Sequence, residues 1–536
     1  MGIGRFEQRS SVFASGGMVA ASSPLATQAG LRVLMDGGNA VDAALTTAAV
    51  VGVVEPMMNG LGGDMWAMIW SEDEQRVYGL NASGRCPEGL SAGSFAGRTT
   101  IPQVGWDSVT VPGAGDGYSV LHERFASRPL SELVAPAVGF ARDGFPVGES
   151  IAHVWACGAG KLEQFGTAGY LVDGRVPVPG QRFRQPELAD TWELFGREGR
   201  DGFYTGPVAR EVERACAAGG GAVTEADLRA QRAEWVEPIG LGYRGRQILE
   251  MPPNGQGIVA LVALGMLAFD DLGSLSPADR MHLEIEATRI GFEEAELRVG
   301  DPRCVEVDVA SLLTESALSR LRDRVDRRTA RTRPMAAGAQ GDTTYLCVVD
   351  AAGNAVSLIT SISDIFGAGV VAGNTGVLMH NRAAAFSLHP TSPNLIGPGR
   401  RPRHSILPAM AMRDGRPEIV FGCMGGNMQP QGHVQLLVNV LDLDMGLQAA
   451  VDAPRYRLLD GAEVAFEETL DAELVADLER RGHQRVTGEP PPSDRTSPHA
   501  FVRSFKGSAQ MIRFHRDHGS LEGATDPRLD GVAIGL

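Results

Sequence analysis

The sequence has 536 residues and a formal net charge of −16 at pH 7, a balance that argues against nucleic acid and anionic membranes as partners. Its six cysteines are scattered without C-x-x-C spacing, so neither a disulfide framework nor a cysteine zinc site is expected. No run of about 18 apolar residues occurs and the first residues lack an apolar signal segment, so we expect no membrane-spanning helix and a cytoplasmic location.

Short apolar runs bounded by turn residues predict strands, and periodic apolar patterns with capping signals predict helices. Strands are expected at residues 17–21, 65–70, 76–80, 370–379, 409–412 and 418–421. Helices are expected at residues 24–35, 40–54, 255–267, 277–299 and 433–441, the second of them capped by Asn39. Strands and helices in similar measure, with several antiparallel hairpin signals, predict a layered α+β fold rather than a βαβ repeat.

One internal stretch has the pattern of a linker followed by a new N-terminal strand. Residues 325–342 are polar, basic and rich in small residues, and we expect them to form a flexible linker. The apolar runs 343–349 and 355–362, joined by a turn, then predict a β-hairpin with Thr343 at its leading edge. Cleavage of the Asp342–Thr343 bond would give Thr343 a free α-amine of pKa roughly 7.7–8.0, a base beside its own hydroxyl.

A threonine pair at a strand start is also ordinary strand composition, and spacing alone favours that interpretation. Two other features favour a catalytic role for Thr343. Ser361, at the far end of the return strand, should lie beside Thr343, where its hydroxyl can hold the amine or Oγ1. Gly425 and Gly426 precede a helix and offer consecutive N–H groups of the kind that bind an oxyanion, although such a pair is also a common turn.

Short motifs carry a family resemblance along nearly the whole chain. They are Gly37-Gly38-Asn39-Ala40-Val41-Asp42, Gly60-Leu61-Gly62-Gly63-Asp64, Val111-Pro112-Gly113, Gly300-Asp301-Pro302, Thr343-Thr344, Gly425-Gly426 and Asp526-Pro527-Arg528. In these motifs and their order the chain resembles the γ-glutamyltranspeptidase (γ-glutamyltransferase) superfamily of self-processing N-terminal-nucleophile (Ntn) hydrolases.

The resemblance implies an αββα sandwich built from a large chain, 1–342, and a small chain, 343–536, which together form one domain. It makes Thr343 the cleavage-site residue and nucleophile, and Gly425 and Gly426 the oxyanion hole. Ser361 stands where the family has a supporting threonine. The implied partners are a small-molecule amide and the two subunits of one precursor, without nucleic acid or membrane. A homodimer or a heterotetramer is left open as the assembly.

The substrate-binding positions depart from the γ-glutamyl pattern of the family. Where the family binds the glutamyl carboxylate and amine, this chain has Ser83-Gly84 with Arg85 just beyond, Ser363, Arg382, Ala385 and His404-Ser405. Each lost charge-assisted contact costs roughly 1.5–3 kcal/mol, and Arg382 would repel a substrate ammonium, so glutathione is not expected to be the best substrate. The pattern is similar to the γ-glutamyltransferase-like branch that includes oxamate amidohydrolases and, more distantly, some cephalosporin acylases.

The expected substrate is therefore an amide whose acyl part carries a carboxylate but no α-ammonium. Arg85, Arg403 and His404 are candidate anchors because a guanidinium binds a carboxylate through two hydrogen bonds. The alternatives are structural ion pairs for the arginines and a hydrogen-bonded core histidine for His404. Thr343 would attack the amide and form an acyl-enzyme, which water or an acceptor amine releases. Two other functions stay open, a glutathione-type γ-glutamyl enzyme and a non-cleaving scaffold.

One further pair of residues has metal-ligand spacing. His282 and Glu286 are four residues apart on an expected helix and share a face. Without a third ligand nearby in the sequence, a structural pair is the favoured interpretation, and neither a metal nor another cofactor is expected.

Overall fold

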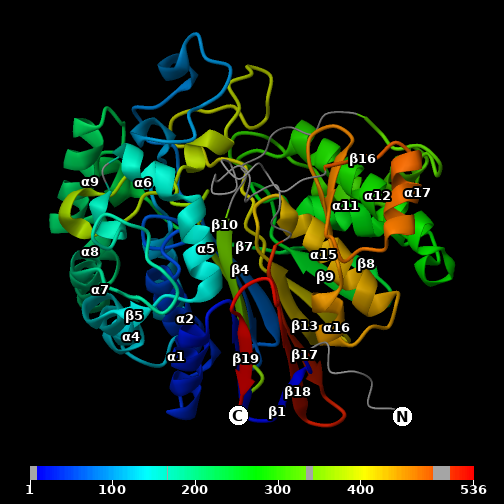
Figure 1. Cartoon of the computed structure of the whole chain (residues 1–536), viewed down its shortest axis with the longest axis horizontal. Coiled ribbons are helices and arrows are strands. Elements are labelled where there is room, and N and C mark those ends of the chain that lie inside the picture. Colours follow the sequence, from blue (N-terminus) through cyan, green and yellow to red (C-terminus); the bar gives the residue numbers. More distant parts are fainter. Residues whose placement is uncertain (1–8, 166, 333–341, 487–506) are drawn as a thin grey trace.

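The computed structural model describes residues 9–165, 167–332, 342–486 and 507–536, and its centre consists of two seven-stranded antiparallel sheets packed against each other (Figure 1). The strands of the first sheet, in order, are β1 (Val12–Ala14), β18 (Ser520–Thr525), β17 (Ala509–His515), β13 (Arg416–Cys423), β12 (Ala409–Arg413), β9 (Arg246–Glu250) and β8 (Ile239–Tyr243). Those of the second are β19 (Val532–Gly535), β2 (Gly17–Ala21), β10 (Asp342–Asp350), β11 (Ala355–Ser363), β3 (Asp64–Ser71), β4 (Arg76–Ala82) and β7 (Glu234–Val236).

Helices cover the outer face of each sheet (Figure 1). On the side of the second sheet lie α1 (Pro24–Met35), α2 (Ala40–Val54), α3 (Ala114–Phe125), α4 (Leu130–Asp143), α5 (Glu149–Cys157), α6 (Ala159–Phe165), α7 (Pro186–Glu198), α8 (Arg200–Tyr204), α9 (Gly206–Ala218) and α10 (Glu225–Ala230). On the other side lie α11 (Gly257–Leu267), α12 (Pro277–Arg298), α13 (Val309–Leu312), α14 (Glu315–Arg322), α15 (Met428–Leu441), α16 (Leu447–Asp452) and α17 (Ala472–Arg480). The four-layer αββα sandwich predicted from the sequence is thus confirmed.

The described residues also form two small sheets. They pair β5 (Phe145–Pro146) with β6 (Arg182–Phe183), and join β14 (Tyr456–Leu458), β15 (Glu463–Phe466) and β16 (Gln484–Arg485).

The predicted hairpin lies in the middle of the second sheet. Strand β10 runs between β2 and β11, with Tyr345 opposite Ile359 and Val349 opposite Ala355. Strand β11 is buried along its whole length, and β10 is buried from Thr343 onward. Helix α2 covers one face of the hairpin and the first sheet covers the other, so both faces need apolar side chains. This two-sided burial explains why the sequence here is a nearly continuous apolar run.

Helix α2 shows how local signals position the layer behind the hairpin. Asn39 accepts hydrogen bonds from the backbone N–H groups of Val41 and Asp42, and the Asp42 side chain accepts the Asn39 N–H in return. This capping box starts the helix at the predicted place. All of its residues are buried, so its small alanine side chains let α2 pack against the sheet and against α1 and α4.

Two expected elements differ from the observed ones. The predicted strand at 370–379 is wrong: the segment holds one bridge, between Val371 and Leu378, around a 3₁₀ turn at Gly373–Thr375. Gly373 and Gly376 have positive φ, which interrupts an extended strand. The helix expected at 433–441 begins earlier, at Met428, because Pro430 falls in the first turn, where a missing N–H breaks no intrahelical bond.

Part of the expected linker 325–342 is described. Residues 325–332 lie against α12 and the end of α17: the Ala330 N–H donates to the Arg481 carbonyl, and the Arg331 guanidinium pairs with Glu293 at 3.1 Å. Residues 333–341 and the side chain of Asp342 lie outside the described part of the chain.

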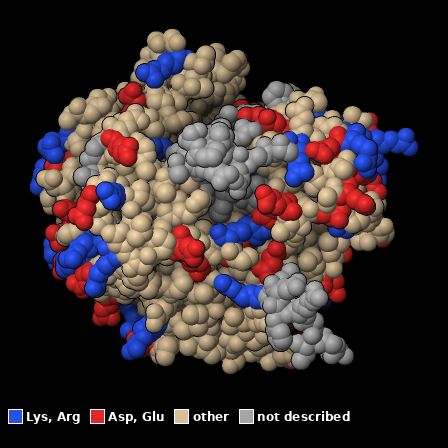
Figure 2. All heavy atoms as spheres, viewed as in Figure 1, with Lys and Arg blue, Asp and Glu red and all other residues tan. Residues whose placement is uncertain are grey.

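The surface carries both signs of charge. On the face shown in Figure 2, basic and acidic side chains are interspersed. None of the helices in the described ranges combines the length and the apolar character that crossing a bilayer requires.

Candidate active site

The candidate nucleophile, Thr343, is fully buried near the start of β10. Its Oγ1 lies 3.3 Å from Ser361 Oγ on β11. The pairing of the two strands produces this contact: Asp342 lies opposite Ser363 and Thr344 opposite Thr360, with an irregularity in register between them. The structure therefore brings together the two hydroxyls that the hairpin pattern predicts to be neighbours.

The first turn of α15 also reaches Thr343. Gln429 Nε2 lies 3.4 Å from Thr343 Oγ1, while Gln429 Oε1 accepts the Leu407 N–H at 2.8 Å. Gly425 and Gly426 stand four and three residues before Gln429, in the connection from β13 to α15, with φ of 113° and 61°. Within the described chain neither glycine N–H donates to another backbone carbonyl. The start of this helix thus offers N–H donors in the neighbourhood of the hydroxyl.

A buried arginine stands on the other side of Ser361. Ser361 Oγ accepts the Ser363 N–H at 2.9 Å and lies 3.2 Å from Arg382 Nη2. Arg382 Nη1 donates to Ser405 Oγ at 3.3 Å. Burial lowers the pKa of Arg382 to about 10 against the opposing effect of Asp64, so the guanidinium stays charged at neutral pH. One hydroxyl group separates this cation from Thr343 Oγ1.

The counter-charge of Arg382 is Asp64, at the start of β3. Its Oδ2 lies 3.5 Å from Arg382 Nε, 2.9 Å from His404 Nε2 and 3.2 Å from His380 Nδ1. Its Oδ1 accepts the Gly84 N–H at 2.7 Å. Burial alone would raise the pKa of Asp64, but the two histidines hold it well below its ordinary value. The carboxylate is therefore ionised and orients three side chains at once.

His404 is neutral in this arrangement. Burial and the Arg382 charge lower the pKa of His404 to about 3. Its Nδ1 accepts the Ile406 N–H at 3.3 Å, so Nε2 carries the proton that is donated to Asp64. The ring stacks on Trp66, with centroids 5.1 Å apart. His404 thus positions Asp64 through a donated hydrogen bond.

Most of the predicted site residues are joined by these contacts. The connected set is Thr343, Ser361, Ser363, Arg382, His404 and Ser405. Arg85 and Arg403 are engaged elsewhere: Arg85 pairs with Glu234, and Arg403 pairs with Glu296. Among the described residues neither of these two side chains hydrogen-bonds to Thr343, Ser361 or Arg382.

Sequence reasoning missed three residues of this neighbourhood, namely Asp64, His380 and Gln429. Asp64 ends a stretch quoted for the family resemblance, and Gln429 follows the glycine pair by three residues, but nothing in their spacing assigns them a partner. His380 follows the incorrectly predicted strand at 370–379 and carries no signal of its own.

A second network lies behind the nucleophile strand. Thr344 Oγ1 donates to Glu55 Oε2 and accepts from Asn59 Nδ2, both at 2.8 Å, and Ser22 Oγ also donates to Glu55. Burial raises the pKa of Glu55 to about 7. These contacts fix β10 at the residue that follows Thr343.

Comparisons with known proteins identify the family of this chain. The family model described as gamma-glutamyltranspeptidase matches residues 26–536. The chain belongs to the gamma-glutamyltranspeptidase family. It is 36% identical to the oxamate amidohydrolase proenzyme of Klebsiella pneumoniae over 97% of this chain and 98% of that protein. It is 33% identical to the glutathione hydrolase-like YwrD proenzyme of Bacillus subtilis over 98% of this chain and 99% of that protein.

A solved structure has the same fold. The crystal structure of cephalosporin acylase from Bacillus halodurans superposes with a TM-score of 0.92 at 35% sequence identity, covering 100% of this chain and 98% of that one. As a member of this family, the chain is an Ntn-type enzyme made as a self-processing proenzyme that is cleaved into a large and a small subunit.

Proposed function

We propose that this enzyme hydrolyses an amide whose acyl group carries a carboxylate close to the reacting carbonyl, as in oxamate and other short dicarboxylic monoamides. The observation that supports this best is the position of Arg382, a fully buried guanidinium separated from the candidate nucleophile by the Ser361 hydroxyl. A guanidinium in that place suits an anionic group on the substrate.

The reaction begins with cleavage of the Asp342–Thr343 bond, which frees the α-amine of Thr343. Thr343 Oγ1 then attacks the substrate carbonyl and passes its proton to that amine. The N–H groups of Gly425 and Gly426 bind the negative charge that develops on the carbonyl oxygen. The amine of the leaving group takes the proton and departs, and water, activated by the same α-amine, releases the acid from the acyl-enzyme.

Charge decides which acyl group fits beside Arg382. A carboxylate about 4 Å from a guanidinium is attracted by about 4 kcal/mol at an effective dielectric constant of 20, before the cost of its desolvation. An ammonium at a similar distance is repelled by a comparable amount. The α-ammonium of a γ-glutamyl group is therefore unfavourable beside this guanidinium.

The distance from the nucleophile limits the length of the acyl group. Arg382 and Thr343 contact the same hydroxyl, Ser361 Oγ, so a carboxylate bound by Arg382 lies near the attacked carbon. We therefore expect oxalyl and malonyl amides to react faster than glutaryl amides. Arg85 and Arg403, the other candidate anchors, are less suited to this role because neither side chain hydrogen-bonds to Thr343 or Ser361 among the described residues.

Turnover of two amides tests the proposal. The wild-type protein should release ammonia from oxamate faster than it releases p-nitroaniline from γ-glutamyl-p-nitroanilide, and Thr343→Ala should release neither. Faster turnover of the γ-glutamyl compound would favour the glutathione-type alternative. No turnover of any amide by a correctly cleaved protein would contradict the proposed substrate class.

A further inference from the structure

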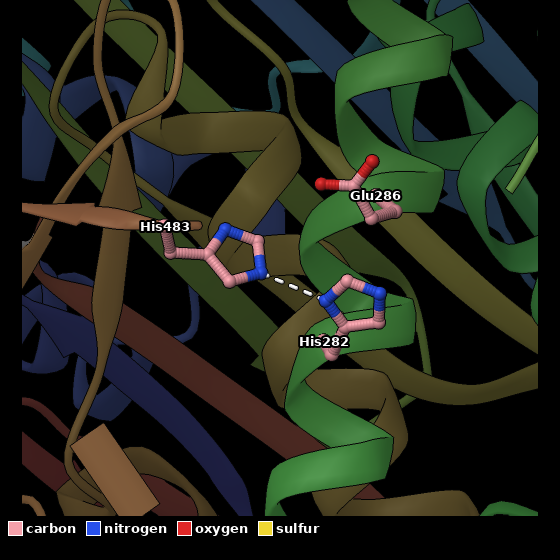
Figure 3. A group of neighbouring side chains, drawn as sticks. All are labelled: His282, Glu286 and His483. Atoms are coloured by element: carbon pink, nitrogen blue, oxygen red, sulfur yellow. Dashed lines mark hydrogen bonds between the residues drawn. The ribbon is translucent and has the colours of Figure 1, made fainter. Parts of the chain in front are cut away.

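Helix α12 carries a cluster of metal-ligating side chains (Figure 3). His282 and Glu286, one turn apart on this helix, face His483, which follows α17. One ligand atom from each residue lies within 4.8 Å of the other two, and all three residues are buried. The sequence pattern contains only the first two of them, because His483 is 201 residues distant from His282. The fold thus supplies, from a distant part of the chain, a third candidate ligand that the sequence pattern does not contain.

The hydrogen bonds of His282 have the pattern of a histidine that ligates a metal. Its Nε2 lies 2.8 Å from the carbonyl oxygen of Asp326, which can only accept, so Nε2 carries the proton. Its Nδ1 therefore keeps a lone pair, which points to His483 Nε2 at 2.8 Å. Metal-bound histidines usually donate their other ring N–H to a carbonyl or carboxylate in this way, which fixes the ring and its tautomer.

Two buried polar atoms of the cluster lack hydrogen-bond partners among the described residues. They are Glu286 Oε1 and His483 Nδ1. An unsatisfied buried polar atom costs about 1–3 kcal/mol, so such atoms call for an explanation. A bound cation explains Glu286 Oε1 directly. It also replaces the His282–His483 hydrogen bond, because both rings direct a lone pair to the ion once the proton of neutral His483 moves from Nε2 to Nδ1.

The protonation states suit a cation. Burial lowers the pKa of His282, and burial and the charge of Arg289 lower the pKa of His483 to about 3, so both rings are neutral at pH 7. Neutral imidazole is the form that binds a metal. Burial raises the pKa of Glu286 to about 7, and an ion beside it would favour its ionised form.

Arg289 limits the kind of ion that can bind. Its Nε lies 3.8 Å from Glu286 Oε1, while its Nη1 donates to the Arg331 carbonyl at 2.8 Å and to the Gly461 carbonyl. This positive charge opposes any cation. A hard ion that depends on several charged oxygen ligands, such as Ca²⁺ or Mg²⁺, is disfavoured, whereas an ion that imidazole nitrogens bind well is the better match.

We propose that His282, Glu286 and His483 form a binding site for a divalent transition-metal ion of the zinc type. Zinc bonds of about 2.0–2.2 Å in a tetrahedral arrangement place ligand atoms roughly 3.3–3.6 Å apart. The two histidine nitrogens need to separate slightly from 2.8 Å, and the carboxylate needs to approach from at most 4.8 Å. Three protein ligands leave one position for water.

The site would join the two subunits, a consequence that depends on the proposed cleavage at Thr343. His282 and Glu286 belong to the large chain, and His483 belongs to the small chain. The same side chains also hold the end of the described large chain, because His282 binds the Asp326 carbonyl and Glu286 accepts the Arg331 N–H at 3.2 Å. A bound ion would therefore stabilise the association of the subunits after the chain is cut.

Metal binding can be measured on the full chain without reference to activity. Apo-protein is titrated with Zn²⁺ and, separately, with Co²⁺, whose visible absorption reports coordination by nitrogen and oxygen. The Thr343→Ala variant is included because an uncut chain contains the same three ligands. Variants His483→Gln and Glu286→Gln remove one ligand each, and His518→Gln removes an exposed histidine as a matched control.

The expected result is about one Zn²⁺ bound per chain, in wild type, Thr343→Ala and His518→Gln alike. His483→Gln and Glu286→Gln should weaken binding by more than the roughly 10- to 100-fold that loss of an outer-shell partner costs, and should abolish the Co²⁺ band. A wild-type protein that binds less than half an equivalent of Zn²⁺ would contradict the proposed site. Ligand variants with unchanged Zn²⁺ affinity and Co²⁺ spectrum would contradict it as well. The wild-type titration gives an answer even if a variant misfolds. If Zn²⁺ binds as expected but the new N-terminus is not Thr343, the metal site is supported and only its proposed role between the subunits is contradicted.

Discussion

Arg382→Gln should reverse the substrate preference of the enzyme. In the wild type the guanidinium donates toward Ser361 and Ser405 and balances Asp64. Glutamine keeps a hydrogen-bond donor, on a shorter side chain, but removes the charge. Asp64 then retains the hydrogen bond donated by His404 and its 3.2 Å contact with His380 Nδ1, and the net charge beside the nucleophile changes from neutral to negative.

The expected magnitude follows from the contact that is lost. A charge-assisted hydrogen bond contributes about 1.5–3 kcal/mol, and 1.36 kcal/mol corresponds to a factor of ten in rate. The kcat/KM for oxamate should therefore fall roughly 10- to 150-fold. Turnover of γ-glutamyl-p-nitroanilide should rise, because the substrate ammonium meets the uncompensated Asp64 in place of a guanidinium.

Steady-state kinetics on both substrates measure this change. Arg246→Gln is the matched control. Arg246 lies on β9 and pairs with Glu418 at 2.8 Å, and its replacement should leave both rates within about twofold of the wild-type values. Thermal unfolding of each variant checks that the fold is retained. An equal fall in both rates would refute the electrostatic argument. A loss of oxamate turnover in Arg85→Gln or Arg403→Gln, with Arg382→Gln unaffected, would transfer the anchor to one of those residues.

Three other substitutions test separate parts of the structure. Ser361→Ala leaves the Arg382 and Ser363 donors without their acceptor and should slow turnover at least about fivefold, whereas Ser361→Thr should restore it. Burial raises the pKa of Glu55 from 4.5 to about 7, so the wild type loses stability as pH rises from the lower to the higher value. Glu55→Gln does not titrate, so its stability relative to wild type should increase over this pH range and stay constant above pH 7. Urea unfolding at several pH values measures this difference. Asn39→Ala removes the cap of α2 and should lower the free energy of unfolding by about 1 kcal/mol, measured in the same way.

The sequence predicts those parts of the site that local pattern controls. A hairpin with a short turn sets its own register, so the contact between Thr343 and Ser361 follows from the alternation and the turn alone. The capping box of α2 is similarly local, since it lies within four residues. The glycine pair before α15 is visible in the sequence for the same reason.

Contacts between distant segments could not be predicted in this way. Asp64, Arg382 and His404 come from three segments far apart in the sequence, and only the packed sheets bring their side chains together. His483 meets His282 through the packing of α17 on α12, for which the sequence pattern has no signal. The false strand at 370–379 shows the opposite failure, because glycines with positive φ override a run of strand-forming residues.

The N-terminal sequence of the small subunit is the most direct test of the central claim, that Thr343 becomes a nucleophile with its own amine as base. Edman degradation or intact mass should place the new terminus at Thr343, and the Thr343→Ala chain should stay uncut and inactive. An active enzyme with an intact Asp342–Thr343 bond, or with a terminus at another residue, would contradict the account.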